Sequence, residues 1–382
     1  MKREIYTEEH DSFRDAFRKF LEKEVVPHQD EWIRAGIVPR EIWKTTGEQG
    51  FIAPWMPEEY GGAGADFLYS AVEIEEIARI AETGFALNLH GEIIVPYIAA
   101  FGNEEQKKKW LPGCASGDII TAVAMTEPDA GSDVTGAITS AVKDKDEYVI
   151  NGSKMFITNG DLAKYMNVFC LTDPDHKDRH QRHSFFIVET DRKGFQSNKL
   201  HGKLGIRAND TAEVSFSNVR VPASNLVGQL GNGFRELMAF FNLTRLHICA
   251  MAVGIARAAL EEASNHIKKR RQFGVPLVSF QALQFKIAEM ATMIRAARNL
   301  YYEAAWLTDN GKMDHAVTAM AKWFSGQVAV KCADEALQMH GGYGYIDEYK
   351  VQRIYRDAKI VEIYEGTKEI EKTIVAKNVL RI

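Results

Sequence analysis

The chain is short of cysteine, and its four cysteines lie far apart. Cys114, Cys170, Cys249 and Cys332 form no CxxC pair. This spacing argues against a disulfide scaffold and against a structural zinc site. We therefore expect four reduced, mostly buried thiols and no metal centre.

The chain also lacks an excess of basic charge. Its 47 Lys and Arg residues against 52 Asp and Glu residues give a formal net charge of −5. Proteins that bind nucleic acid need a surplus of positive charge to neutralise phosphates. No nucleic-acid partner is expected.

Long apolar runs are missing as well. The most apolar stretch, residues 85–101, is interrupted by Asn88, His90, Glu92 and Pro96, so no membrane span is expected. The first residues, MKREIYTEEH, turn acidic at once and lack the pattern of a signal or transit peptide. These features predict a soluble protein of the cytoplasm.

What the chain does have is enough length for two or three domains, with 382 residues of which 46% are hydrophobic. Its first third is helical in pattern. Phe13, Phe17 and Phe20 recur at steps of three and four residues, and residues 67–80 repeat this spacing. The segment PEEYGGAGA near residues 57–65 separates the two.

The middle third changes to short segments rich in β-branched and aromatic residues. They cover residues 137–142, 148–150, 185–188 and 211–216. Turn pairs, Asn151-Gly152 and Asn159-Gly160, stand between some of them. The pattern predicts an antiparallel β domain of the barrel or sandwich type.

The last third is again helical, with amphipathic patterns over residues 246–271, 279–310, 316–340 and 363–380. Four helices with short joins indicate a four-helix bundle. The expected fold class is therefore α+β and multidomain: an N-terminal all-α domain (1–120), the β domain (121–228) and the bundle (229–382). Gly341 and Gly342 follow a helix and not a strand, which excludes a dinucleotide-binding loop of the Rossmann type.

Three groups of residues are candidates for chemistry. The first, TEPDAGSD at 126–133, combines glycine with small polar side chains, so its backbone can approach a ligand closely, although an ordinary turn has the same composition. The second, KMFITNG at 154–160, would place Phe156 and Thr158 on one face of a strand. That face suits a planar ligand, and equally a half-buried strand.

The third group is IYEGT at 363–367, in which Glu365 stands between an aromatic residue and a glycine at a predicted helix start. A helix N-terminus favours the charged carboxylate, whereas burial beside an apolar substrate raises its pKa. A general base for a weakly acidic carbon needs both influences. A simple helix-capping acid is the alternative.

Together these groups resemble the acyl-CoA dehydrogenase family, and the likeness extends from Thr7 to Arg381. Further motifs that match are RANDT at 207–211, RRQFG at 270–274, QMHGG at 338–342 and RDAKI at 356–360. The resemblance implies an FAD-dependent enzyme that makes a 2-enoyl-CoA from an acyl-CoA. It also implies an electron-transfer flavoprotein as electron acceptor and a homotetramer built as a dimer of dimers.

The resemblance further assigns roles to residues, with Glu365 as the catalytic base. FAD contacts would come from Val123, Met125, Thr126, Ser132, Phe156, Thr158, Thr367 and Glu369, and, for the FAD of a partner subunit, from Arg270, Gln272, Phe273, Gln281, Gln338, Gly341 and Gly342. Acyl-CoA contacts would come from Ser132, Asn242, Arg245 and Gly366.

Some relatives carry the base on a bundle helix, directly before the arginine that corresponds to Arg245. Here that position is Thr244, which leaves Glu365 as the base. Phe156 stands where many members have Trp, and Glu369 where medium-chain enzymes have Gln.

The substrate is less well defined by the sequence. Phe85 and Leu89 would make the chain end of the pocket apolar, and no arginine nearby would hold a distal carboxylate. The pattern suits a medium or long straight chain, or a branched or alicyclic group. His90, Glu92 and Tyr97 either line the pocket or are structural. An acyl-CoA oxidase-like enzyme and a non-catalytic FAD- or acyl-CoA-binding homologue are the rival functions.

Overall fold

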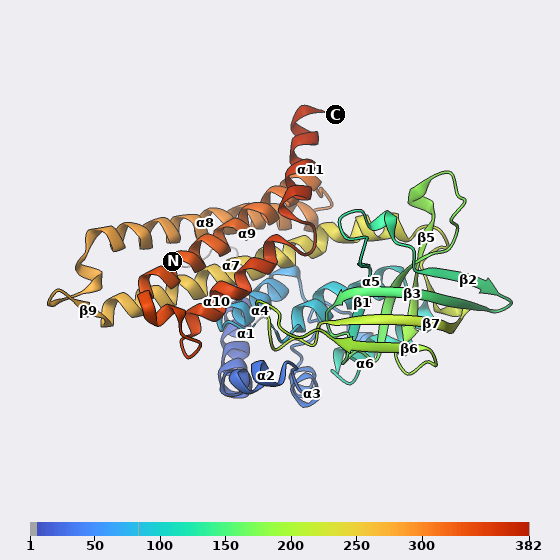
Figure 1. Cartoon of the computed structure of the whole chain (residues 1–382), viewed down its shortest axis with the longest axis horizontal. Coiled ribbons are helices and arrows are strands. Elements are labelled where there is room, and N and C mark those ends of the chain that lie inside the picture. The colour runs from blue at the N-terminus through green and yellow to red at the C-terminus, as the bar shows by residue number, and fades with distance from the viewer. Residues whose placement is uncertain (1–5, 83, 382) are drawn as a thin grey trace.

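The computed structural model describes residues 6–82 and 84–381, and its element order is helical, then β, then helical (Figure 1). This confirms the predicted order, while the domain limits at 120 and 228 stay predictions. The first region contains α1 (Glu8–Phe20), α2 (Gln29–Ala35), α3 (Arg40–Glu48), α4 (Phe67–Arg79), α5 (Val95–Phe101) and α6 (Glu104–Ala115).

The middle region is one sheet whose strands run in the order β6-β7-β3-β2-β4-β5-β8, with β1 beside β4. Its strands are β1 (Thr121–Ala124), β2 (Ser140–Asp144), β3 (Glu147–Ile157), β4 (Tyr165–Leu171), β5 (His183–Glu189), β6 (Phe195–Lys199), β7 (Ala212–Pro222) and β8 (Leu226–Val227). The prediction of a wholly antiparallel sheet is wrong, because β1 and β2 both pair with β4 in parallel.

Two predicted details of strand β3 are also wrong. Asn151-Gly152 is no turn, since β3 continues through it with a shift in register against β7. Phe156 and Thr158 do not alternate on one strand face. A second register shift lies between Lys154 and Ile157, Phe156 has a left-handed φ of 61°, and the strand ends at Ile157.

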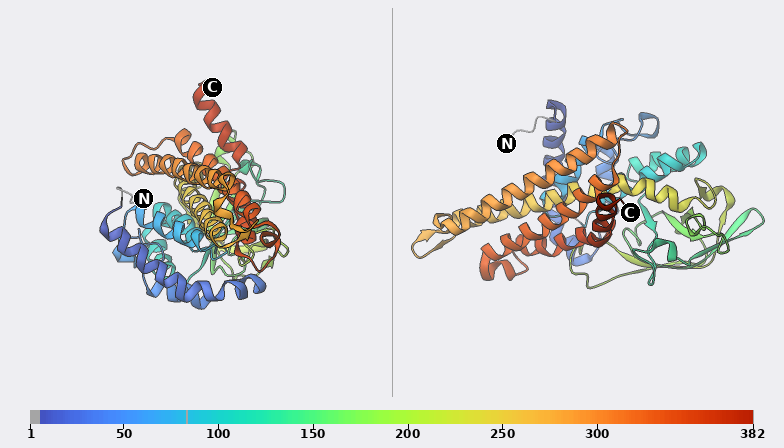
Figure 2. Two further views of the ribbon diagram at one scale, coloured as in Figure 1. Left: turned by 90° about the vertical axis from the view of Figure 1, so that its left-hand side faces the viewer. Right: turned by 90° about the horizontal axis from the view of Figure 1, so that it is seen from above.

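The last region contains α7 (Gly233–Lys269), α8 (Gln281–Asp309), α9 (His315–His340), α10 (Lys350–Ala358) and α11 (Lys368–Leu380), with a short hairpin of β9 (Arg271–Gln272) and β10 (Val275–Pro276). The three long helices lie side by side in the views of Figures 1 and 2, and α11 projects away from them. Helix α7 starts 13 residues before the predicted Leu246, and α10 was not predicted.

Helix α7 is the centre of the largest core cluster and packs on α4, α8, α9 and α10. It approaches α4 so closely that a Cβ on Gly254 would lie 2.6 Å from Ala78 Cβ. Glu75 of α4 ties the layers together, since it accepts hydrogen bonds from Arg257 of α7 and Tyr301 of α8.

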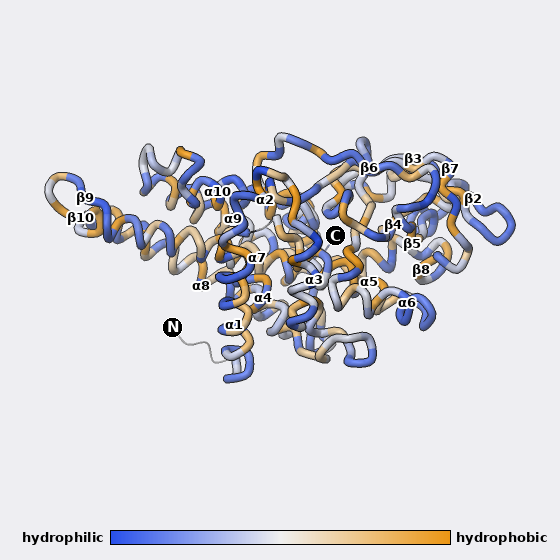
Figure 3. Tube along the Cα trace, turned by 90° about the horizontal axis from the view of Figure 1, so that it is seen from below, coloured by the Kyte–Doolittle hydropathy of each residue, from blue (hydrophilic) through white to orange (hydrophobic). Residues whose placement is uncertain are grey.

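By length and composition α7 could cross a membrane, yet 78% of its apolar window is buried inside the protein, as in the core helix of a soluble fold. Figure 3 shows apolar residues where the central helices pack, and hydrophilic ones at the tip of the β2–β3 hairpin.

A buried ion pair joins the first two candidate motifs within the sheet. Lys154 Nζ lies 2.8 Å from Glu127 Oε1 and also donates to the carbonyl oxygen of Met125, at 2.9 Å. Met155 N–H donates to the carbonyl oxygen of Thr126 at 2.8 Å. These contacts fix the segment after β1 against the end of β3, with Thr126 bonded to Met155, the residue before Phe156.

We predict that Lys154→Met destabilises the protein by about 3–5 kcal/mol, because it leaves the buried Glu127 carboxylate without its counter-ion. Urea unfolding followed by circular dichroism measures the loss. Lys143→Met, at an exposed position of β2, is the matched control and should change stability by less than about 0.5 kcal/mol. Equal effects of the two variants would contradict the structural role of the pair.

Candidate active site

The carboxylate of Glu365 lies in a narrow apolar pocket between the sheet, the N-terminal helices and α7. The pocket is lined by Ile93, Ile94, Tyr97, Val123, Met125, Asn167, Phe185, Leu237, Phe240, Phe241, Thr244 and Glu365. Two of the predicted cofactor contacts, Val123 and Met125, therefore share one pocket with the predicted base. Of the described lining residues none carries a positive charge, which agrees with the absence of an arginine for a distal carboxylate.

Glu365 does not start a helix as predicted. It lies in a turn between the 3₁₀ segment η10 (Lys359–Glu362) and α11, whose N-cap is Thr367. Its backbone is left-handed, with φ of 52°. Non-glycine residues avoid this region because Cβ crowds the backbone, so neighbouring contacts must hold the turn in place.

Thr244 of α7 occupies the position at which some relatives carry the base, and it contacts Glu365. Its hydroxyl donates a hydrogen bond of 2.7 Å to Glu365 Oε2. Burial raises the pKa of Glu365 above the usual 4.5, while the Thr244 hydrogen bond and the charges of Lys322 and Arg245 oppose that rise. The carboxyl thus holds a proton more readily than an exposed glutamate, and donors beside it limit the change.

Lys322 of α9 lies under the same turn. Its buried ammonium donates to the carbonyl oxygen of Tyr364 at 2.8 Å and to that of Gly366. Burial lowers the pKa of Lys322, and the charges of Glu371 and Glu365 oppose this. One side chain therefore binds the backbone on both sides of Glu365.

Arg245 and Glu371 form a second buried pair beside the turn, with Arg245 Nε 3.0 Å from Glu371 Oε1. Burial raises the pKa of Glu371 to about 7. Gly366, with φ of 95°, fits against this pair, because a Cβ there would lie 2.2 Å from Glu371 Oε1. Asn242, another predicted substrate contact, is buried one turn earlier on α7.

The remaining predicted contacts of the flavin ring lie on the sheet side. Phe156 is 66% exposed, an unusual state for a large aromatic residue. Thr126 and Thr158 are partly buried, and Ser132 lies in an exposed loop. An exposed aromatic ring flanked by hydroxyl groups suits a flat heterocycle, which it can stack on and hydrogen-bond.

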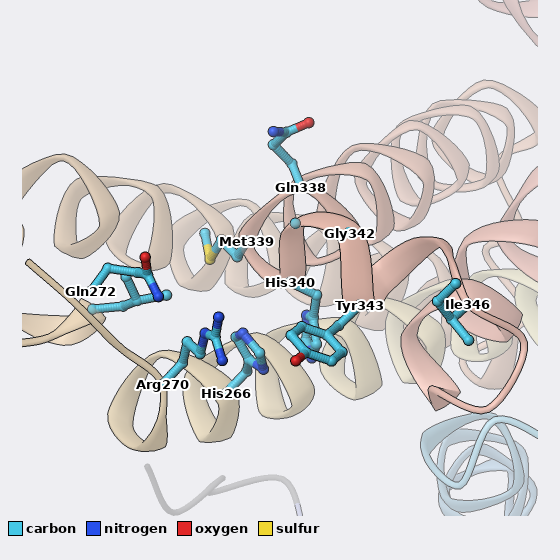
Figure 4. A pocket seen from close by; sticks show the side chains of 11 residues that line it. His266, Arg270, Gln272, Gln338, Met339, His340, Gly342, Tyr343 and Ile346 are labelled. Carbon is cyan, nitrogen blue, oxygen red and sulfur yellow. The ribbon is translucent and has the colours of Figure 1, made fainter.

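A second pocket, of about 480 Å³, lies at the other end of α7 (Figure 4). Its lining includes the predicted residues Arg270, Gln272, Gln338, Gly341 and Gly342, whereas Phe273 and Gln281 are exposed outside it. A Cβ on Gly341 or Gly342 would meet nothing within 4 Å, so this rim is open to a ligand.

The two pockets cannot serve one compact ligand within a single chain. Thr244 lies within α7 and Arg270 is the residue that caps its C-terminus, 26 positions later, which at 1.5 Å per residue is about 39 Å along the helix. Figure 1 shows α7 running from the sheet to the β9–β10 hairpin. The predicted cofactor residues therefore form two separate groups.

The residues expected at or near the chain end of the pocket fall into two groups, those that line it and those that do not. Phe85 packs against Trp43, with ring centroids 4.9 Å apart, and neither it nor Leu89 lines the pocket. His90 is structural, since its ring nitrogens bond Thr121 Oγ1 and the carbonyl oxygen of Cys114. Glu92 is buried outside the pocket, whereas Tyr97 does line it.

Sequence reasoning missed Lys322, Glu371 and Asn167. Lys322 in the middle of α9 and Asn167 in the buried strand YMNVFCL are polar residues inside an otherwise buried pattern, whereas Glu371, in the first turn of α11, lies among exposed and half-buried residues and gives no such signal. Such an interruption is a usable signal, because buried polar side chains are costly without partners.

Comparison with known families covers nearly the whole chain. Residues 7–118 match the N-terminal domain of acyl-CoA dehydrogenases, residues 122–219 the middle domain and residues 231–380 the C-terminal domain.

Among curated relatives, an acyl-CoA dehydrogenase of Bacillus subtilis is 44% identical over 98% of both chains. The long-chain specific mitochondrial acyl-CoA dehydrogenase of Sus scrofa is 40% identical over 99% of this chain and 88% of its own. A short-chain specific acyl-CoA dehydrogenase of Clostridium acetobutylicum is also 40% identical, over 98% of this chain and 99% of its own. Sequence identity alone thus does not distinguish relatives that are specific for short acyl chains from those specific for long ones.

Solved structures give the same picture. An acyl-CoA dehydrogenase of Geobacillus kaustophilus superposes with a TM-score of 0.96 at 45% identity, covering 99% of this chain and 100% of the other. A chain from the structure of the electron transferring flavoprotein of Acidaminococcus fermentans superposes with a TM-score of 0.95 at 39% identity, and the match covers all of both chains. A glutaryl-CoA dehydrogenase of Mycobacterium smegmatis in complex with FADH2 superposes with a TM-score of 0.92 at 29% identity. The match covers 99% of this chain and 96% of the other.

We predict that Gly366→Ala destabilises the protein by about 2–5 kcal/mol, because backbone strain adds to the overlap with Glu371. The matched control is Gly311→Ala, which has a positive φ of 66° but no atom within 4 Å of the new Cβ. It should cost about 1–2 kcal/mol. Chemical unfolding of both variants separates the two effects, and an equal loss would show that the Glu371 contact is unimportant.

Proposed function

The chain belongs to the acyl-CoA dehydrogenase family and is an oxidoreductase, and we propose that it introduces an α,β double bond into an acyl-CoA thioester with Glu365 as the base. The observation that carries this proposal is the position of Glu365. Its carboxylate faces an apolar pocket and accepts a hydrogen bond from Thr244, which occupies the place of the rival base.

In the proposed reaction Glu365 Oε removes the proton from the α carbon. A buried carboxylate with a raised pKa is a stronger base than a free one, and the apolar walls keep water from competing for the same proton. Thr244 directs the carboxylate by holding Oε2. The backbone N–H of Glu365 makes no hydrogen bond within the described residues, so it is available to the thioester carbonyl, where negative charge develops.

The family uses FAD, which when bound accepts the hydride from the β carbon. The residues present fit such a group. Thr126 and Thr158 offer hydroxyl groups and Phe156 an exposed ring, and Val123 and Met125 lie in the pocket wall. Thr367 and Glu369, which follow the base in the chain, are also proposed to contact the FAD. The proposed contacts of the acyl-CoA are Ser132, Asn242, Arg245 and Gly366.

The proposed electron acceptor is an electron-transfer flavoprotein. The support is the close likeness to a chain from the electron transferring flavoprotein structure of Acidaminococcus fermentans. The proposed setting is fatty acid β-oxidation in the cytoplasm. The proposed substrate is a medium or long straight-chain acyl group, or a branched or alicyclic one, because the pocket walls are apolar.

We predict that Glu365→Gln retains bound FAD and loses turnover by about 10²–10⁴-fold or more. The assay follows flavin bleaching by a panel of straight, branched and cyclic acyl-CoAs, then turnover with an electron-transfer flavoprotein or with oxygen. Glu348→Gln, at an exposed position, serves as the control. Near-normal turnover of the Glu365→Gln variant would refute the assignment, and preference of the wild type for oxygen would favour an oxidase.

We predict that Thr244→Val moves the acidic limb of the kcat/KM–pH profile to higher pH. The active form of Glu365 is deprotonated, and the Thr244 hydrogen bond lowers a pKa that burial raises above 4.5. Removal of that bond raises the pKa further, so activity is lost at a higher pH as the solution is acidified.

The control for this prediction is Thr318→Val. Thr318 is a buried threonine of α9 whose hydroxyl has no hydrogen-bond partner among the described residues. Its profile should not move. A shift common to both variants would point to a general packing effect and not to the hydrogen bond.

We predict that the flavin-loaded protein is a homotetramer, a dimer of dimers. The far pocket contains Arg270, Gln272, Gln338, Gly341 and Gly342 but lies about 39 Å along α7 from Thr244. These residues, with Phe273 and Gln281, are proposed to bind the FAD of a partner subunit. Sedimentation velocity tests the assembly, and a flavin-loaded monomer would contradict it.

A further inference from the structure

Among the residues that the structure describes, one polar side chain of the pocket around Glu365 has no hydrogen-bond partner. Asn167 of β4 is 1% exposed, lines the pocket, and neither its Oδ1 nor its Nδ2 forms a hydrogen bond within the described residues. The other polar groups of the lining are paired. Tyr97 donates to Glu236 at 2.8 Å, and Thr244 donates to Glu365 at 2.7 Å.

The backbone fixes the direction of the Asn167 side chain. Asn167 pairs with Val123 of β1 and with Ile187 of β5 in the sheet. Its neighbours two residues away, Tyr165 and Phe169, belong to the core cluster on this face, whereas Met166 and Val168 belong to the cluster on the other. The carboxamide therefore lies on the pocket side of the sheet.

A buried carboxamide without hydrogen bonds costs free energy that an aliphatic residue of the same shape avoids. At this position a leucine would complete an apolar wall. The free donor and the free acceptor are therefore complementary to a ligand group that can both accept and donate. An uncharged hydroxyl meets this requirement, since it can pair with either amide atom.

Other ligand groups fit less well. A carboxylate only accepts hydrogen bonds, and it would enter a pocket that holds the Glu365 carboxylate and, among its described lining, no cation. A keto oxygen also only accepts, so it leaves Asn167 Oδ1 unpaired. A saturated chain satisfies neither atom.

Resting on the proposed function, we propose that Asn167 is a specificity-determining residue that selects acyl-CoAs with a hydroxyl group on the acyl chain beyond the two reacting carbons. A site that pairs a substrate hydroxyl discriminates against the analogue without it, because its own polar atoms are then left buried and unpaired. The rival occupant is an internal water molecule, since the space between the lining side chains is about 20 Å³.

The test compares octanoyl-CoA with hydroxyoctanoyl-CoAs that carry the hydroxyl on each acyl carbon beyond the two reacting ones. Initial rates of flavin bleaching and kcat/KM are measured for the wild type, for Asn167→Leu, which has nearly the same shape, and for the smaller Asn167→Val. Ile94→Leu changes another pocket wall without changing polarity and is the matched control.

We expect the wild type to favour one hydroxyoctanoyl-CoA over octanoyl-CoA by about 10-fold or more in kcat/KM. Asn167→Leu and Asn167→Val should reverse that preference without lowering the melting temperature, and Ile94→Leu should affect both substrates alike. The wild-type comparison decides by itself if a variant fails to fold.

Two failures are distinguishable. If octanoyl-CoA bleaches the flavin but no hydroxyl position is favoured, or if Asn167→Leu leaves the ratio unchanged, the amide binds water or nothing and the inference is overturned while the proposed function stands. If no acyl-CoA of either kind bleaches the flavin, the proposed function fails and the inference with it.

Discussion

The close packing of α7 against α4 and α9 governs the arrangement of both pockets. Gly254 lets α7 approach Ala78 and Glu75 without a side chain between them, and the small buried residues that follow it continue the contact. Because α7 carries Thr244 and Arg245 near one pocket and Arg270 at the other, its rigid length sets the separation of the two sites. A helix held on several sides cannot shorten that distance, so the two groups of proposed cofactor contacts stay separate within one chain.

The chemistry proposed for Glu365 depends on a balance of opposing influences on one carboxyl group. Burial in an apolar pocket favours the protonated form, and Thr244, Lys322 and Arg245 favour the charged form. Burial alone would leave a weak acid that seldom gives up its proton, and cations in direct contact would leave a carboxylate that is a poor base. Arg245 instead pairs with Glu371, and Lys322 bonds to backbone oxygens, so both act on Glu365 from a distance.

Much of the fold could be predicted because hydrophobic spacing and turn residues are local signals. The long helices α8 and α9 agree with their predicted ranges within a few residues. Asn151-Gly152 failed as a turn because the pairing of β3 with β7 continues across it, and such a bulge depends on a partner strand distant in sequence. Glu365 and Thr244 were found by their motifs, but their hydrogen bond spans 121 residues. Lys322, Glu371 and Asn167 belong to no motif, and only the three-dimensional arrangement gives them a role.

The two bonds of Lys322 to the turn have a consequence for the peptide dipoles around Glu365. In a trans peptide unit the C=O and the N–H point in opposite directions. The carbonyl of Tyr364 shares its peptide unit with the N–H of Glu365, so an ammonium that draws this oxygen inward turns that N–H outward. The same holds for Gly366 and the N–H of Thr367. A single buried lysine thereby aims the positive ends of the two peptide dipoles on either side of the Glu365–Gly366 unit away from the core.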